Sequence, residues 1–142
     1  MRMEEHAREM SFPIIPRETG LFLSLISQTS NASTVFEFGS GFGYSAYWFI
    51  KGMGPKGRVF TSDAREVNHF KLRHFLESTG YLDQIEPFLG WAKEHLEKLD
   101  SQFDIIYNDG IKKQYEQTWL LARKYIRPAG STSPIIVFGA EK

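Results

Sequence analysis

A glycine-rich loop, between a short apolar run and a helical pattern, holds the residue types best suited to binding chemistry. Gly39, Gly41 and Gly43 are spaced G-x-G-x-G. Glycines let the backbone approach a ligand closely, and the helix that begins near Tyr44 offers unpaired N–H groups. A dinucleotide fingerprint would be G-x-G-x-x-G, with its third glycine where this chain has Tyr44, and no Lys-Ser/Thr pair follows as a P-loop requires. The spacing therefore disfavours a site for a pyrophosphate.

Two carboxylates flank this loop in the sequence. Glu37 stands two residues before the first glycine, where its charge would repel a phosphate and attract an ammonium group. Asp63 follows Gly43 by 20 residues and ends the next strand-like run, the place where an acid accepts hydrogen bonds from ribose hydroxyls. Together they predict a nucleoside without phosphates that carries an ammonium and a carboxylate, a composition that S-adenosylmethionine has. The alternative is that loop 39–43 is only a tight turn and that Asp63 caps a helix.

The segments around these residues alternate between strand and helix patterns. This alternation predicts a Rossmann-like α/β fold, a doubly wound sheet of about five parallel strands with helices on both faces. Pro87 confines the third strand to an edge of the sheet. Residues 1–16 are interpreted as a charged lead-in followed by an extended arm. The predicted strands are 34–38, 58–63, 85–89, 103–107 and 134–138, and the predicted helices are 17–28, 44–53, 67–78, 93–99 and 115–126.

Apolar residues recur at helical spacing in three of these helices, which indicates their apolar faces. The residues are Leu21, Phe22, Leu25 and Ile26 in the first helix, Phe70, Leu72, Phe75 and Leu76 in the third, and Tyr115, Trp119, Ala122 and Ile126 in the last.

Composition narrows the class of protein. The chain has 142 residues, 17 Lys+Arg against 17 Asp+Glu, and no Cys. This length fits one domain, 1–142. Zero net charge argues against binding nucleic acid or an anionic membrane, and the lack of Cys excludes a disulfide scaffold and a thiolate site. No apolar run approaches the length of a membrane span and no secretory signal is visible, so a cytoplasmic protein is expected.

In order along the chain, these motifs resemble the cation-dependent class I O-methyltransferases of the catechol and caffeoyl-CoA type. The resemblance runs from about Pro13 to Gly130. It rests on Glu18-Thr19-Gly20, on Glu37-Phe38-Gly39-Ser40-Gly41-Phe42-Gly43-Tyr44-Ser45, on Gly57-Arg58-Val59-Phe60-Thr61-Ser62-Asp63, and on Phe103-Asp104-Ile105-Ile106-Tyr107-Asn108-Asp109.

The resemblance implies an S-adenosylmethionine-dependent O-methyltransferase that acts on a small hydroxylated, catechol-like acceptor. Glu37 and the glycines would line the methionine end of the cofactor, with Ser45 near its carboxylate and Asp63 on its ribose. Trp91 and Ala92 stand where the family meets the adenine.

For catalysis, the resemblance implies that Asp109 binds Mg²⁺ or another divalent cation. Lys112 would take the proton from the acceptor hydroxyl. The alternative is that Asp109 caps a helix and that Lys112 is a solvated side chain.

The chain departs from the family pattern at several positions. Ile111 stands where the family often has a second acid, and Gly90-Trp91-Ala92 replaces Gly-Asp-Ala. Residues 131–142 lack the Asp-Asn pair that completes the family's metal site, and the family's last two strands are missing. We therefore expect a C-terminally truncated or minimal domain whose fifth strand is an exposed edge, a surface for a homodimer. The alternative function is a non-catalytic cofactor-binding or interaction module.

Overall fold

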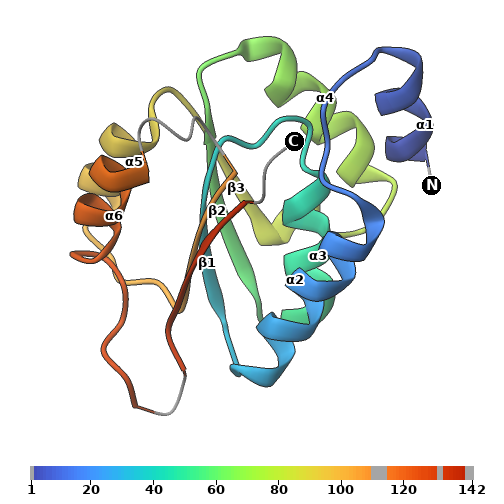
Figure 1. Cartoon of the computed structure of the whole chain (residues 1–142). Helices are drawn as coiled ribbons and strands as arrows, with labels where there is room; N and C mark the ends of the chain where they lie inside the picture. The colour runs from blue at the N-terminus through green and yellow to red at the C-terminus, as the bar shows by residue number, and fades with distance from the viewer. Residues whose placement is uncertain (1, 110–114, 131–132, 140–142) are drawn as a thin grey trace.

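The structure is a computed structural model that describes residues 2–109, 115–130 and 133–139 (Figure 1). Predicted and observed boundaries agree closely for the strands and for most helices. Among the described residues, no helix is long and apolar enough to cross a membrane. The elements are α1 (Arg2–Glu9), α2 (Arg17–Thr29), β1 (Thr34–Phe38), α3 (Tyr44–Met53), β2 (Arg58–Asp63), α4 (Glu66–Glu77), η1 (Leu82–Gln84), β3 (Ile85–Leu89), α5 (Ala92–Leu99), β4 (Ile105–Asn108), α6 (Tyr115–Ala122) and β5 (Ile135–Phe138).

The five strands form one parallel sheet in the order β3-β2-β1-β4-β5. This arrangement confirms the predicted doubly wound fold, with β3 at one edge. The strand order reverses between β1 and β4, and in open α/β sheets ligands bind beyond the carboxyl ends of the strands at such a reversal. Parallel pairing brings Glu37 of β1 opposite Thr61 of β2 and Tyr107 of β4.

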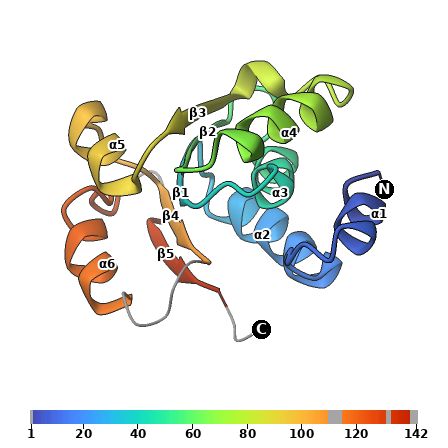
Figure 2. The same ribbon diagram turned by 90° about the horizontal axis from the view of Figure 1, so that it is seen from above.

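Helices cover both faces of the sheet. Seen from above, α5 and α6 lie on one side and α1 to α4 on the other (Figure 2). Each layer encloses its own apolar cluster, with Phe49 and Leu72 in the larger one and Leu96 and Phe103 in the smaller one. The sheet is therefore buried on both faces, and its carboxyl edge is the place where loops meet.

The interpretation of residues 1–16 as a charged lead-in and extended arm is wrong for its first part. Residues 2–9 form α1, an α-helix whose buried side chains are Met3 and Ala7. These residues are one helical turn apart, so a single face packs on the domain while the charged residues remain outside. Only residues 10–16 lack helical structure before α2 begins.

The apolar face expected for residues 17–28 is also mostly wrong. Leu21, Phe22 and Leu25 are more than half exposed, and the buried residues of α2 are Gly20, Leu23 and Ser27. Close contact between α2 and α3 explains which face of α2 is buried. A Cβ on Gly20 would collide with the Trp48 ring, and one on Gly52 would collide with the Ser24 carbonyl oxygen. The small residues thus let α2 and α3 lie in close contact, which turns the larger apolar side chains outward.

Two further aromatic residues were expected on apolar faces. Phe70 is 72% exposed, because Asn68, Leu72, Phe75 and Leu76 form the buried face of α4. Trp119 is 46% exposed, because Thr118 and Ala122 form the buried face of α6.

Candidate functional site

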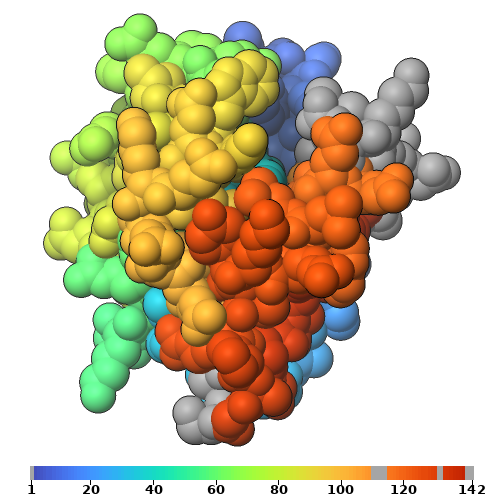
Figure 3. All heavy atoms as spheres, turned by 90° about the vertical axis from the view of Figure 1, so that its left-hand side faces the viewer, coloured from blue at the N-terminus to red at the C-terminus, as the bar shows by residue number. Residues whose placement is uncertain are grey.

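Two adjoining cavities lie at the carboxyl edge of the sheet. The larger, of about 1090 Å³, is lined by residues from α5 and α6, and the smaller, of about 210 Å³, lies between the glycine loop and residues 12–15. Figure 3 looks onto α5 (yellow) and α6 (orange), which border the larger cavity. The two cavities share Phe38, Gly39, Asp63 and Arg65. A ligand placed at Asp63 can therefore extend into both.

Glu37 is a fully buried carboxyl group that lines the smaller cavity. The Ser45 hydroxyl donates to its Oε1, and the Thr61 hydroxyl donates to its Oε2 at 2.8 Å. Burial raises the pKa of Glu37 to about 8, against the opposing effect of these two hydrogen bonds, and the nearby Asp109 and Asp63 charges raise it further. Glu37 is therefore largely protonated at neutral pH, and a cation in the cavity would favour its charged form.

The glycine loop uses backbone conformations that other residues rarely adopt. Gly39 has φ +81° and Gly43 has φ +87°. A Cβ on Gly43 would lie 2.9 Å from Leu76 Cδ1 of α4, so α3 begins packed directly against that helix. A Cβ on Gly39 would meet nothing within 4 Å, because this residue borders both cavities. Gly43 is thus needed for packing, and Gly39 leaves space for a ligand.

Asp63 lies at the end of β2 and is held by three donors. Its Oδ2 accepts hydrogen bonds from the Gly41 backbone N–H at 3.2 Å and from Asn68 Nδ2 at 2.8 Å, and its Oδ1 accepts from the Arg65 backbone N–H at 2.9 Å. The contacts with Arg65 and Asn68 lie at the start of α4, so they agree with the alternative that Asp63 caps this helix. They also hold the carboxylate at the junction of the cavities, where it retains acceptor capacity for a ligand hydroxyl.

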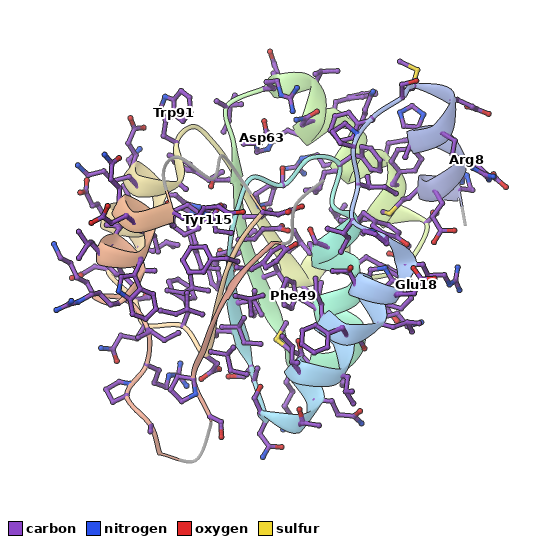
Figure 4. All side chains as sticks on the ribbon, in the orientation of Figure 1. Arg8, Glu18, Phe49, Asp63, Trp91 and Tyr115 are labelled. Carbon is purple, nitrogen blue, oxygen red and sulfur yellow. The ribbon has the colours of Figure 1, made fainter. Side chains whose placement is uncertain are left out.

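The larger cavity contains the two residues expected near an adenine. Trp91 is 70% exposed and Ala92 begins α5, and both line the cavity. Figure 4 places Trp91 and Asp63 at the same upper edge of the sheet, whereas Phe49 lies inside the domain. An exposed indole beside a cavity is available to stack on a flat base.

Another polar group in the larger cavity, Ser62, has no recognisable motif in the sequence. Ser62 is 2% exposed, and its Oγ has no hydrogen-bond partner among the described residues. It lies between the ends of β1 and β3 in the sheet, in the lining of the larger cavity. A buried hydroxyl without a partner is costly unless a ligand or water satisfies it.

Asp109 lies next to the end of β4 and lines the smaller cavity with Glu37. Its charge contributes to the raised pKa of Glu37, after the larger effect of burial. Lys112, the predicted base, lies outside the described residues. Within 2–109, 115–130 and 133–139, no group of three or more His, Cys, Asp or Glu side chains is placed to hold a metal. Asp109 as a metal ligand therefore stays a prediction.

The structure brings six of the predicted residues together around the smaller cavity and two more around the larger one, which Gly39 and Asp63 also line. The six are Glu37, Gly39, Gly41, Ser45, Asp63 and Asp109, and the two are Trp91 and Ala92. Sequence reasoning missed Thr61, Ser62, Phe12 and Arg65. Thr61 could have been found only from the strand register, which places it opposite Glu37.

Comparison with known proteins agrees with this arrangement. A family model described as O-methyltransferase matches residues 2–131. The catechol O-methyltransferase of Mycobacterium tuberculosis (strain H37Rv) is 31% identical over 108 residues, which cover 75% of this chain and 49% of that protein. The chain thus spans about half the length of this curated relative.

Solved structures show the same likeness. The O-methyltransferase from Bacillus cereus in complex with SAH has a TM-score of 0.86 at 26% identity, covering 96% of this chain and 63% of that one. The O-methyltransferase TomG from Streptomyces achromogenes, in complex with SAM, has a TM-score of 0.78 at 26% identity, covering 86% and 57%. With its parallel sheet, its glycine loop and its carboxyl-edge cavities, the chain belongs to the O-methyltransferase family.

Proposed function

We propose that this chain binds S-adenosylmethionine across the two cavities and is the cofactor-binding part of an O-methyltransferase that acts on a small, catechol-like hydroxylated acceptor. The observation that carries the proposal is the junction of Glu37, the glycine loop and Asp63 between a small polar cavity and a large one with an exposed indole. Relatives with SAM or SAH bound and a relative named for catechol methylation support the same choice.

The residues fit the parts of this cofactor by their chemistry. A buried, protonated Glu37 can give up its proton when an ammonium group arrives, and the new ion pair then stabilises its charged form. Ser45 lies beside Glu37, and its one hydroxyl proton is donated to that residue, so Ser45 can donate to the carboxylate of the same amino acid moiety only by turning this proton away from Glu37. Asp63 can accept ribose hydroxyls, and Trp91 can stack on the base.

The bound cofactor would supply a methyl group on a positively charged sulfur. The acceptor hydroxyl must lose its proton as its oxygen forms the new bond to carbon, so a base is required. We propose Lys112 for this role. Asp109 borders the smaller cavity from the β4 end, and we propose it as the residue that would contribute to holding a divalent cation. Mg²⁺ or another divalent cation at Asp109 would lower the pKa of the hydroxyl, but the described residues do not form a metal site around it.

Calorimetric titration with S-adenosylmethionine tests the cofactor proposal directly. NAD serves as the comparison ligand, and Glu37→Gln as the variant. We expect a Kd in the micromolar range, about −8 kcal/mol, a Kd about 100-fold higher in Glu37→Gln, and no binding of NAD. A folded chain that binds NAD but not S-adenosylmethionine would overturn the proposal.

A methylation assay with a panel of catechols tests the catalytic part. Turnover that falls in Lys112→Ala supports the base, and turnover that falls with a chelator supports a divalent cation. Binding without turnover would favour the non-catalytic module. A cytoplasmic location and a homodimer through β5 stay predictions, the latter checked by sedimentation of the purified chain.

A further inference from the structure

Phe12 lies directly on the glycine loop. Its ring packs against the Phe42 ring with centroids 4.9 Å apart, and its Cε1 atom lies 3.3 Å from the position that a Cβ on Gly41 would occupy. On the other side, the Arg65 guanidinium lies 5.8 Å from the centroid of the Phe12 ring. Phe12 is thus in contact with the loop and with the segment that follows β2, and it lines the smaller cavity together with Arg65.

Arg65 is held in this position by the acid expected to bind ribose. Its Nε lies 3.7 Å from Asp63 Oδ1, and its backbone N–H donates to the same oxygen. Asp63 also accepts the Gly41 backbone N–H. Contacts therefore connect four residues in a ring at the border of the smaller cavity, namely Phe12, Gly41, Asp63 and Arg65.

Helix α1 fixes the segment that carries Phe12. The Tyr44 hydroxyl, in the first turn of α3, donates to Glu4 Oε1 at 2.6 Å, and this hydrogen bond lowers the pKa of Glu4. The His6 ring lies 5.6 Å from the Phe42 ring and 5.1 Å from the Phe75 ring. In Figure 1, α1 (blue) lies beside α4, and the segment after it runs down past the glycine loop to α2. The position of Phe12 is therefore set by contacts outside the cavity.

We propose that Phe12 and Arg65 form a clamp over the smaller cavity, and that they are positioning residues that slow the release of the cofactor's amino acid moiety. This inference rests on the proposed function. A ligand in the smaller cavity would contact both residues, because Phe12 and Arg65 both border the space between the glycine loop and Asp63. Neither residue takes part in the chemistry of methyl transfer.

Surface plasmon resonance with the immobilised full chain and S-adenosylhomocysteine tests the clamp through the dissociation rate. We expect Phe12→Ala to raise this rate about tenfold and Arg65→Gln to raise it several-fold, with smaller changes in the association rate. Phe12→Tyr keeps the ring and should restore the slow release.

Arg8→Gln is the matched control, because Arg8 is an exposed arginine on α1 that points away from the sheet (Figure 4). It should release the ligand at the wild-type rate. Melting temperatures of the ligand-free variants separate a loss of fold from a loss of the clamp, and Arg65→Gln should leave this temperature unchanged.

Slow release from Arg65→Gln and Phe12→Ala alike would overturn the clamp while leaving the cofactor proposal intact. If the wild-type chain is folded but binds no S-adenosylhomocysteine, the proposed function is wrong, and the clamp proposal, which rests on it, is wrong as well.

Discussion

Two buried carboxyl groups at opposite ends of the sheet differ in how they are satisfied. Asp104 precedes β4 at the amino end, and its Oδ2 accepts the backbone N–H groups of Ser33 and Thr34 at 2.8 and 3.0 Å and both of their hydroxyls. Its Oδ1 pairs with Arg127 at 3.2 Å. Glu37, at the carboxyl end, has hydrogen bonds from two hydroxyls among the described residues and has a raised pKa.

This difference indicates that the amino end of the sheet stabilises the fold and that the carboxyl end is suited to binding a ligand. Asp104 pairs with Arg127, and its contacts join the starts of β1 and β4. Burial raises the pKa of Glu37 to about 8, and the described groups that act on it are two hydroxyls and two acids. The unpartnered Ser62 hydroxyl also lies at the carboxyl end. Asp104 thus stabilises the fold at the amino end, whereas Glu37 and Ser62 at the carboxyl end border the cavities where a ligand would bind.

The largest expected effect is on stability at the amino end. Asp104→Ala leaves four donors from Ser33 and Thr34 without their acceptor, so we expect a loss of about 3 kcal/mol or more in the free energy of unfolding. Urea denaturation followed by circular dichroism measures it. Asp83→Ala, at an exposed aspartate, is the control and should change stability by less than about 0.5 kcal/mol. Equal stability of the two variants would contradict the structural role of Asp104.

At the carboxyl end, Glu37→Gln should have its main effect on binding. The amide keeps the shape and can still accept from Thr61, but it cannot become an anion to pair with an ammonium group. We expect the Kd for S-adenosylmethionine to rise by about 100-fold, roughly 3 kcal/mol, measured by calorimetry. The folded chain should remain as stable as the wild type at pH 6, and a binding constant that does not change would remove Glu37 from the site.

The raised pKa of Glu37 predicts two pH effects of opposite sign. Without ligand, the pKa of the Glu37 carboxyl is 4.5 in the unfolded chain and about 8 in the folded chain. Its contribution to stability is therefore complete below pH 4.5 and is lost as the pH rises to 8. The loss is at most about 5 kcal/mol. With an ammonium ligand, which requires the anion, affinity should instead rise with pH up to about 8.

Thermal denaturation and calorimetry at pH 6, 7 and 8 check both effects. Calorimetry in two buffers with different ionisation enthalpies should also detect one proton released on binding below pH 8. In Glu37→Gln both pH dependences should disappear. Wild-type binding that does not vary with pH would contradict a protonated Glu37.

The smallest effects compare one serine at each end. Ser33→Ala removes a 2.9 Å hydrogen bond to buried Asp104 and should cost about 1.5 kcal/mol of stability. Ser62→Ala removes a hydroxyl that has no partner in the described part of the chain, so stability should change by less than about 0.5 kcal/mol, while the Kd for S-adenosylmethionine rises roughly fivefold. Denaturation and calorimetry on both variants give the four values. If Ser62→Ala lowers the stability of the chain and leaves the Kd unchanged, Ser62 stabilises the fold and does not bind the ligand.

Most strands and helices were predictable from the sequence because glycine and proline mark their ends. The predicted strand 34–38 and helix 44–53 match β1 and α3 residue for residue. The buried face of α2 was not predictable, because it depends on the close contact of Gly20 with Trp48 and of Gly52 with Ser24. Helix α1 was missed for a related reason: its burial depends on Phe42 and Phe75, which are distant in sequence.

The pattern of strands and motifs in the sequence is enough to place Glu37, the glycines and Asp63 at one edge of the sheet, because every parallel strand ends at the same edge and each motif stands at the end of a strand. The packing of the layers sets the rest: Glu37 is buried beside Thr61 with its pKa raised to about 8, Ser62 has no partner among the described residues, and Phe12 covers the loop. Local patterns specify where strands end. Burial, register and contacts between distant segments arise only when the layers pack, and these set the charge and access of the site.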